Sequence, residues 1–282
     1  TAELLRIPPS HVLIAATGGI GQALPMDRIR AAIPKLVKSL SPQGGRAAAE
    51  AIMTTDTRIK DAALRCEVGG RTVTLGGIDK GVGMIEPHLA TMFCFVTTDA
   101  AVARGALDPI VRRSVDRSFN RITVDSDQST SDTVAVIANG LAENAPLDKG
   151  ARGMRDFAVA LDALVERLAR MLVQDGEGAT KLVSVTVRGA ASRRDALVAA
   201  RSVANSPLVK TAINGADPNW GRIMMALGKA AARVEQDKVP VLPEVRDALP
   251  DTWRALALSG GEDYELVFTA PAAVVDRVRN RA

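Results

Sequence analysis

The chain of 282 residues carries a formal net charge of +4, with 47% hydrophobic and 24% charged residues, the balance of an ordinary globular protein. Its basic residues are dispersed and aromatic residues make up only 3%, so we expect no nucleic-acid partner. No apolar run has the length of a membrane span, and two cysteines predict neither a disulfide framework nor a metal site. The N-terminus has no secretory signal pattern and no initiator methionine, which favours a cytoplasmic protein and a fragment or processed chain.

The first half of the chain alternates expected strands and helices. We expect a buried strand at 11–16, helices at 27–40 and 46–53, a hairpin at 64–75 turning at Gly69-Gly70, a strand at 93–97, and a helix at 99–119 capped by Thr98 or Asp99. Such interspersed elements are typical of an α/β or α+β layered domain.

The second half continues the same alternation. The sequence predicts a polar loop at 127–132, a strand at 133–137, an amphipathic helix at 152–173, a strand at 182–187, and helices at 193–203 and 219–233. The helix at 152–173 places Leu161, Leu164, Val165, Leu168 and Leu172 on one face. Residues 233–245 contain Pro240 and Pro243 and are typical of a linker, so we expect a first domain at 1–232 and a separate segment at 246–282.

Thr91 follows Ala90 at the end of a glycine-rich stretch and precedes an apolar run. A chain break between these two residues would give Thr91 a free α-amine, whose ordinary pKa of roughly 7.7 to 8 leaves part of it neutral at physiological pH. That amine could activate the hydroxyl of the same residue, so Thr91 would supply both nucleophile and base. The alternative is a strand threonine without chemistry, since β-branched residues favour strands.

Four further strings have candidate functional residues. Thr17 and Gly18 open a glycine loop that could cradle an anion on backbone amides but lacks the P-loop ending. Thr57 closes a hydroxyl-rich cluster, Lys80 lies in the glycine-rich stretch before Thr91, and Glu177 stands between two glycines. A turn, a helix cap, an exposed lysine and a solvated loop are the respective structural alternatives.

The two histidines, His11 and His88, lie outside any nucleophile-elbow or zinc-binding pattern. A nucleophile in this chain therefore needs a base other than histidine, which the Thr91 amine would provide.

Together these strings resemble the ornithine acetyltransferase family, also called glutamate N-acetyltransferase, of arginine biosynthesis. The resemblance spans roughly residues 5 to 230 and rests on 17–18 with 24–27, 53–57, 77–98, 118–133, 175–181 and 216–222. It implies an α/β sandwich that cleaves itself at Ala90-Thr91 into an α part, 1–90, and a β part from 91. The junction departs from the family pattern at His88 and at Phe93-Cys94.

The resemblance also implies roles. Thr91 is the expected nucleophile, Thr17 and Gly18 the expected oxyanion-hole pair, and Thr57, Lys80, Thr91 and Glu177 the expected substrate-binding residues. The implied ping-pong reaction moves acetyl from N2-acetyl-L-ornithine to L-glutamate through an acetyl-Thr91 ester. No cofactor is expected, although some family members also use acetyl-CoA as donor, and the implied assembly is a heterotetramer of two α and two β chains without a membrane partner.

Two differences from the family leave alternatives open. The chain lacks the family's N-terminal stretch and its C-terminal segment, so it is expected to be truncated at both ends. Its last residues, 246–282, resemble part of the C-terminal domain of thiamine-monophosphate kinase, as a partial α+β tail. The alternatives are a related self-processing amidohydrolase or aminopeptidase, and an inactive truncated remnant.

Overall fold

The computed structural model describes residues 1–86, 92–129 and 131–230, with the single positions 243, 247 and 250. The chain divides into two compact units, Thr1–Ala179 and Thr180–Ala282. The first unit contains α1 (Ala2–Leu5), η1 (Pro9–His11), α2 (Met26–Lys38), α3 (Gly45–Ala51), β1 (Lys60–Val68), β2 (Arg71–Lys80), β3 (Phe93–Thr98), α4 (Arg104–Arg117), η2 (Phe119–Arg121), β4 (Thr133–Ala138) and α5 (Met154–Gln174). The second contains α6 (Arg193–Ala204), α7 (Pro207–Asn214) and α8 (Trp220–Lys229). The expected linker and kinase-like tail lie almost wholly outside the described residues and stay predictions.

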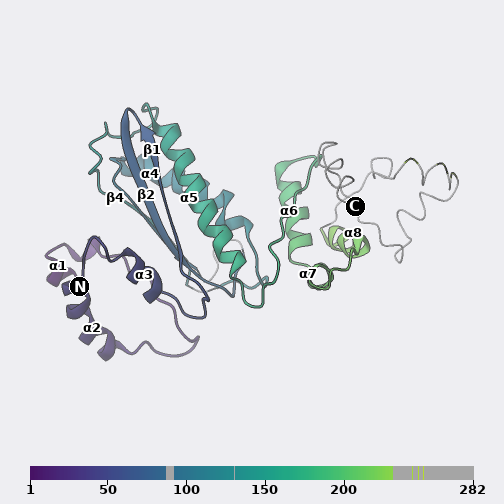
Figure 1. Ribbon diagram of the computed structural model, residues 1–282, viewed down its shortest axis with the longest axis horizontal. Coiled ribbons are helices and arrows are strands. Elements are labelled where there is room, and N and C mark those ends of the chain that lie inside the picture. The colour runs from purple at the N-terminus through teal and green to yellow at the C-terminus, as the bar shows by residue number, and fades with distance from the viewer. Residues whose placement is uncertain (87–91, 130, 231–242, 244–246, 248–249, 251–282) are drawn as a thin grey trace. The chain divides into compact units, whose positions relative to one another are not determined.

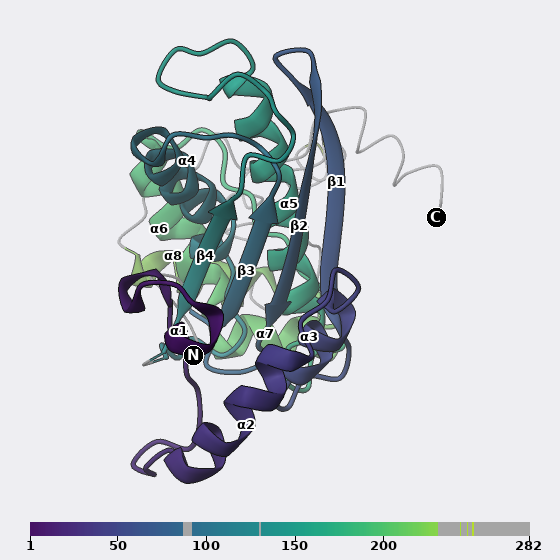
Figure 2. The same ribbon diagram turned by 90° about the vertical axis from the view of Figure 1, so that its left-hand side faces the viewer.

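A four-stranded mixed sheet in the order β1-β2-β3-β4 is the centre of the first unit. β1 and β2 form the expected antiparallel hairpin, in which Gly69 and Gly70 both take positive φ, as a tight turn between paired strands requires. β2 and β3 are antiparallel, whereas β3 and β4 are parallel and joined through α4. Figure 2 shows the four strands side by side, with α4 and α5 behind them on one face. The α/β expectation is thus confirmed at the level of a mixed sheet covered by helices.

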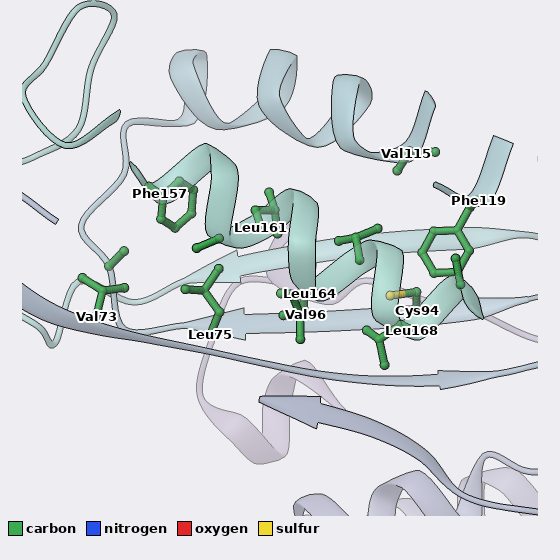
Figure 3. Packing of buried hydrophobic residues seen from close by; sticks show 14 of the residues in the cluster. Val73, Leu75, Cys94, Val96, Val115, Phe119, Phe157, Leu161, Leu164 and Leu168 are labelled. Carbon is green, nitrogen blue, oxygen red and sulfur yellow. The ribbon is translucent and has the colours of Figure 1, made fainter. Parts of the chain in front are cut away.

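The core lies between this sheet and α5 (Figure 1). The five α5 residues expected on one face are all buried, at 1% exposure or less. Leu164 and Leu168 pack toward Leu75 of β2 and Val96 of β3, and Phe119 closes the cluster beyond the far end of α4 (Figure 3). Burying each large aliphatic side chain contributes about 1.5–3 kcal/mol to stability, so the packing of this apolar face against the sheet is a major stabilising contribution in the first unit.

Three expectations for the first unit and the start of the second differ from the structure. Residues 11–16 form no strand: η1 ends at His11, and Leu13 and Ile14 are 72% and 86% exposed. Residues 182–187 are likewise not a strand. A strand needs a partner for its backbone groups, and none of the described residues pairs with either segment. α4 begins only at Arg104, with Ala103 at the N-cap position. The Asp99 side chain accepts the amide of Thr74, and the Thr98 hydroxyl donates to the Thr74 carbonyl, so neither side chain caps this helix.

The regular elements among the described residues of the second unit are all helices. α6, α7 and α8 pack around a small cluster of Val203, Val209 and Ala226. The side chains of Ser192, Ser206 and Asn219 cap the three helices by accepting backbone amides. The sequence reading missed α7, although Ser206-Pro207 is a helix-start signal. Among the described residues, no helix combines the length and the hydropathy of a membrane span.

Candidate active site

A buried ammonium group joins two carboxylates at the end of β1. Lys60 Nζ lies 2.6 Å from Asp56 Oδ1 and 2.6 Å from Asp175 Oδ2, and the three side chains are 0%, 0% and 1% exposed. Asp175 follows α5 immediately, 115 residues after Lys60. Because an unpaired buried charge is very unfavourable, these three groups hold their segments together as one unit. We call Asp56, Lys60 and Asp175 the buried ion cluster.

Each carboxylate of the buried ion cluster also fixes a neighbouring backbone segment. Asp56 accepts the amide of Gly81 at 2.8 Å, at the end of β2, and the amide of Thr54 at 3.0 Å. Asp175 accepts both the amide of Thr57, at 3.0 Å, and its hydroxyl. The cluster therefore fixes the hydroxyl-rich loop 53–57 against the end of β2 and the loop after α5.

In the buried ion cluster, hydrogen bonds lower the pKa of both carboxylates by more than burial raises it. Burial alone would raise the pKa of Asp175, but the bonds from Lys60 and Thr57 lower it to about 2. Burial likewise opposes ionisation of Asp56, yet the bonds from Lys60, Gly81 and Thr54 lower its pKa. Both groups are ionised at neutral pH, which keeps Lys60 paired on two sides.

Asp79, the cross-strand neighbour of Lys60, behaves differently. It is completely buried, and this burial raises its pKa well above the ordinary value although the charge of Lys60 opposes the shift. Burial therefore opposes ionisation of Asp79, whereas Asp56 and Asp175 are the ion-pair partners of Lys60.

Lys80 lies beside the buried ion cluster at the last position of β2. Its Nζ donates to Thr54 Oγ1 at 3.2 Å and stands 5.5 Å from the ring centroid of Phe93, its cross-strand partner. Burial lowers the pKa of Lys80, and the charge of Asp56 opposes that change. Phe93 opens β3 two residues after Thr91, so the ammonium group lies near the strand that Thr91 precedes.

Glu177 reaches the same place from the loop after α5. Its amide donates to the carbonyl of Val82 at 2.8 Å, and its Oε1 accepts the hydroxyl of Thr55 at 3.1 Å. A Cβ at Gly83 would lie 3.1 Å from Glu177 Cδ, so the glycine leaves room for this carboxylate. Glu177 and Thr57 are exposed, whereas the three residues of the buried ion cluster are not. The two exposed side chains could therefore contact a polar ligand.

Three of the residues singled out in the sequence are connected through the loop 54–57. Thr57 belongs to this loop, Lys80 donates to Thr54, and Glu177 accepts from Thr55. Thr17 and Gly18 lie in the extended stretch before α2, and no hydrogen bond joins them to the buried ion cluster among the residues described. Ala90 and Thr91 lie outside the described residues. The roles of all these residues stay predictions.

The sequence reading missed Lys60 and Asp175 as functional residues and noted Asp56 only as part of a hydroxyl-rich string. Nothing local marks Lys60, since a lysine at a strand start is usually solvated. The one available signal was Asp175 at the end of the strongest amphipathic helix, just before Glu177.

The lowered pKa values predict how acid affects stability. Asp175 and Asp56 have pKa values below the ordinary 3.8, so their contribution to folding is complete above about pH 4 and is lost as pH falls toward 2. We expect the free energy of unfolding to fall through this range in the wild type and to fall less steeply in Asp175→Asn. Urea unfolding at pH 5, 4, 3 and 2.5 measures both slopes, and equal slopes would contradict the assignment.

Comparison with known proteins places the chain in a family. The ArgJ family model matches residues 1–261. The arginine biosynthesis bifunctional protein ArgJ of Symbiobacterium thermophilum is 50% identical over 95% of this chain, and that of Geobacter sulfurreducens is 52% identical over 84%. This chain spans 68% and 60% of the lengths of these two relatives. A crystal structure of the same-named protein from Bacillus halodurans matches with a TM-score of 0.48 and 46% identity, over 51% of this chain and 67% of that one. On the match over residues 1–261 and the identity of its relatives, the chain belongs to the ArgJ family.

Proposed function

We propose that the chain is the self-processing acetyltransferase part of an arginine-biosynthesis enzyme, a glutamate N-acetyltransferase. The observation that carries the proposal is that Lys80 and Glu177 both bond to the loop 54–57, which contains Thr57 and which Asp175 of the buried ion cluster holds in place. Membership of the ArgJ family, whose relatives are named for arginine biosynthesis, supports it independently. We extend the proposal to the N-terminal-threonine sandwich fold, to a heterotetramer of two α and two β chains, and to cytoplasmic residence.

In this proposal the Thr91 hydroxyl first attacks the carbonyl carbon of Ala90, and the Ala90–Thr91 C–N bond breaks as an ester forms and the amine takes the hydroxyl proton. Water then hydrolyses this ester, which leaves the Ala90 carboxylate and a Thr91 with free hydroxyl and α-amine. The Thr91 hydroxyl then attacks the acetyl carbonyl of N2-acetyl-L-ornithine, and the new α-amine accepts the hydroxyl proton. The amide C–N bond breaks, the leaving amine takes that proton, and ornithine departs from the acetyl-Thr91 ester. The amine of glutamate attacks the carbonyl carbon of this ester, and the C–O bond to Thr91 breaks. A proton from that amine passes by way of the Thr91 α-amine to the Thr91 oxygen, which releases N-acetylglutamate and restores the hydroxyl.

The other site residues would bind or stabilise charged groups of the substrates and intermediates. Thr17 and Gly18 would donate hydrogen bonds to the oxyanion of each tetrahedral intermediate. Glu177 suits the ammonium end of ornithine by a charge-assisted hydrogen bond. The Thr57 hydroxyl donates to Asp175 and can still accept a hydrogen bond from the substrate. Lys80, with a lowered pKa, supplies a donor near the start of β3. No cofactor enters this scheme, and acetyl-CoA would serve only as another acetyl donor.

The test is an acetyl-transfer assay on the purified chain with N2-acetyl-L-ornithine, with and without L-glutamate. We expect N-acetylglutamate to form faster than free acetate. We also expect Glu177→Gln to raise KM for acetylornithine about tenfold or more, because a hydrogen bond between two charged groups is lost. Acetate release unchanged by glutamate would instead indicate a hydrolase. Absence of both products from a folded, cleaved sample would overturn the proposed function.

A further inference from the structure

Two carboxylates of one loop hold the backbone on either side of the expected cleavage junction. Asp125 accepts the amides of Met84, at 2.5 Å, and Ile85, at 2.9 Å. Asp132 accepts the amide of Met92 at 2.9 Å. Both carboxylates belong to the stretch 118–133, which contributes to the family resemblance but to which the proposed reaction gives no role.

Each contact is doubled by a backbone hydrogen bond in the opposite direction. The amide of Val124 donates to the carbonyl of Ile85 at 2.8 Å, and the amide of Thr133 donates to the carbonyl of Met92 at 3.0 Å. Ile85 and Met92 thus have both their amide and their carbonyl bound to the same loop. Their side chains are 0% and 2% exposed in the core cluster, which fixes the two residues further.

Ile85 and Met92 lie close in sequence to the expected cleavage junction, one on each side. Only residues 86–91 lie between the two held residues, and this short stretch includes Ala90-Thr91. The described residues on either side of the junction are thus held in place before any reaction begins. Attack of a hydroxyl on the carbonyl of the preceding residue depends strongly on such preorganisation.

A carboxylate is the appropriate acceptor for this purpose, because hydrogen bonds to an ionised group are roughly twice as strong as neutral ones. Burial raises the pKa of Asp132 to about 6, against the opposing effect of the Met92 amide. The group is therefore still mostly ionised at pH 7.5. Asp125 also accepts the amide of Asp127, which orders its own loop.

We propose that Asp125 and Asp132 are positioning residues for self-cleavage, which hold Ile85 before the junction and Met92 after it. This inference rests on the proposed self-processing. It assigns to the loop 124–133 a part in maturation, and it gives neither aspartate a contact with the acetyl substrates.

The experiment measures the rate of cleavage by intact mass in a time course at pH 7.5. We expect Asp132→Ala and Asp125→Ala to slow the appearance of the fragment that begins at Thr91 by about 10- to 100-fold, because small losses of alignment cost rates of this order. Asp132→Asn keeps a neutral acceptor of the same shape and should be intermediate. Asp127→Asn, at an exposed carboxylate of the same loop, is the matched control and should cleave at the wild-type rate.

A second measurement separates positioning from loss of folding. The aspartate variants should keep the thermal unfolding midpoint within a few degrees of the wild type, while amide hydrogen exchange quickens at Met92 in the Asp132 variant and at Ile85 in the Asp125 variant. Wild-type cleavage rates in both alanine variants, or slow cleavage that only accompanies general unfolding, would overturn the inference and leave the proposed function intact. A folded wild-type chain that never cleaves would instead refute the proposed self-processing, and the positioning role with it.

Discussion

Replacing Lys60 by Met should lower the free energy of unfolding of the first unit by about 3–5 kcal/mol, because it removes the buried cation that two buried carboxylates share. Among the described residues, Asp56 then has no ion-pair partner, and Asp175 keeps only the largely exposed Arg58, 3.3 Å away. Asp56 and Asp175 each lie 2.6 Å from Lys60 Nζ, and neither side chain is more than 1% exposed. Methionine has nearly the same length as lysine, so the loss of charge dominates over the loss of volume. Urea unfolding followed by circular dichroism measures the change.

The matched control for Lys60→Met is Arg170→Met. Arg170 and Glu166 form an ion pair of similar length, 2.9 Å, but both side chains are 56% exposed. Solvent screens such a pair, so its loss should cost less than about 1 kcal/mol. Adding Asp56→Asn and Asp175→Asn to Lys60→Met should recover part of the stability, since the buried charges are then removed together. Equal effects of Lys60→Met and Arg170→Met would show that the buried ion cluster has no special role.

Replacing Thr91 by Ala should abolish self-cleavage and reduce acetyl transfer by at least about 10³-fold, because the proposed nucleophile and its amine base are lost together. N-terminal sequencing and intact mass should detect two fragments in the wild type, one beginning Thr91-Met92-Phe93, and a single chain in the variant. Thr91→Ser keeps the hydroxyl and should retain slower cleavage.

Two outcomes would contradict this role for Thr91. Cleavage of Thr91→Ala at the same bond would place the nucleophile elsewhere. Cleavage of the wild type without any acetyl transfer would separate maturation from the proposed reaction and favour an inactive chain. The transfer assay and the mass measurement on the same samples distinguish these cases.

Local patterns predicted the elements that depend on local physics. The helix at 152–173 was confirmed as α5, because a 3.6-residue apolar period is visible within the segment itself. The hairpin was confirmed because Gly69-Gly70 supplies the positive φ that its turn needs. The strands at 93–97 and 133–137 were also confirmed, as β3 and β4, where short apolar runs pair along their length.

The strands expected at 11–16 and 182–187 were wrong for one reason. A strand is stable only when a distant segment supplies hydrogen bonds and covers one face, and an apolar run does not show whether that partner exists. Leu13 and Ile14, the most apolar part of the first run, are largely exposed.

The sequence by itself determined the family, the order of the motifs, and the choice of Thr57, Lys80 and Glu177 as candidate site residues. It determined these because motif identity and spacing are properties of the linear chain. Only the tertiary structure decided that Lys80 and Glu177 bond to the loop that contains Thr57. It also decided that Asp56, Lys60 and Asp175 form a buried ion cluster beside that loop. A sequence does not show whether a charged residue is solvated or buried. Its contribution to stability depends on which partner the fold brings within hydrogen-bonding distance.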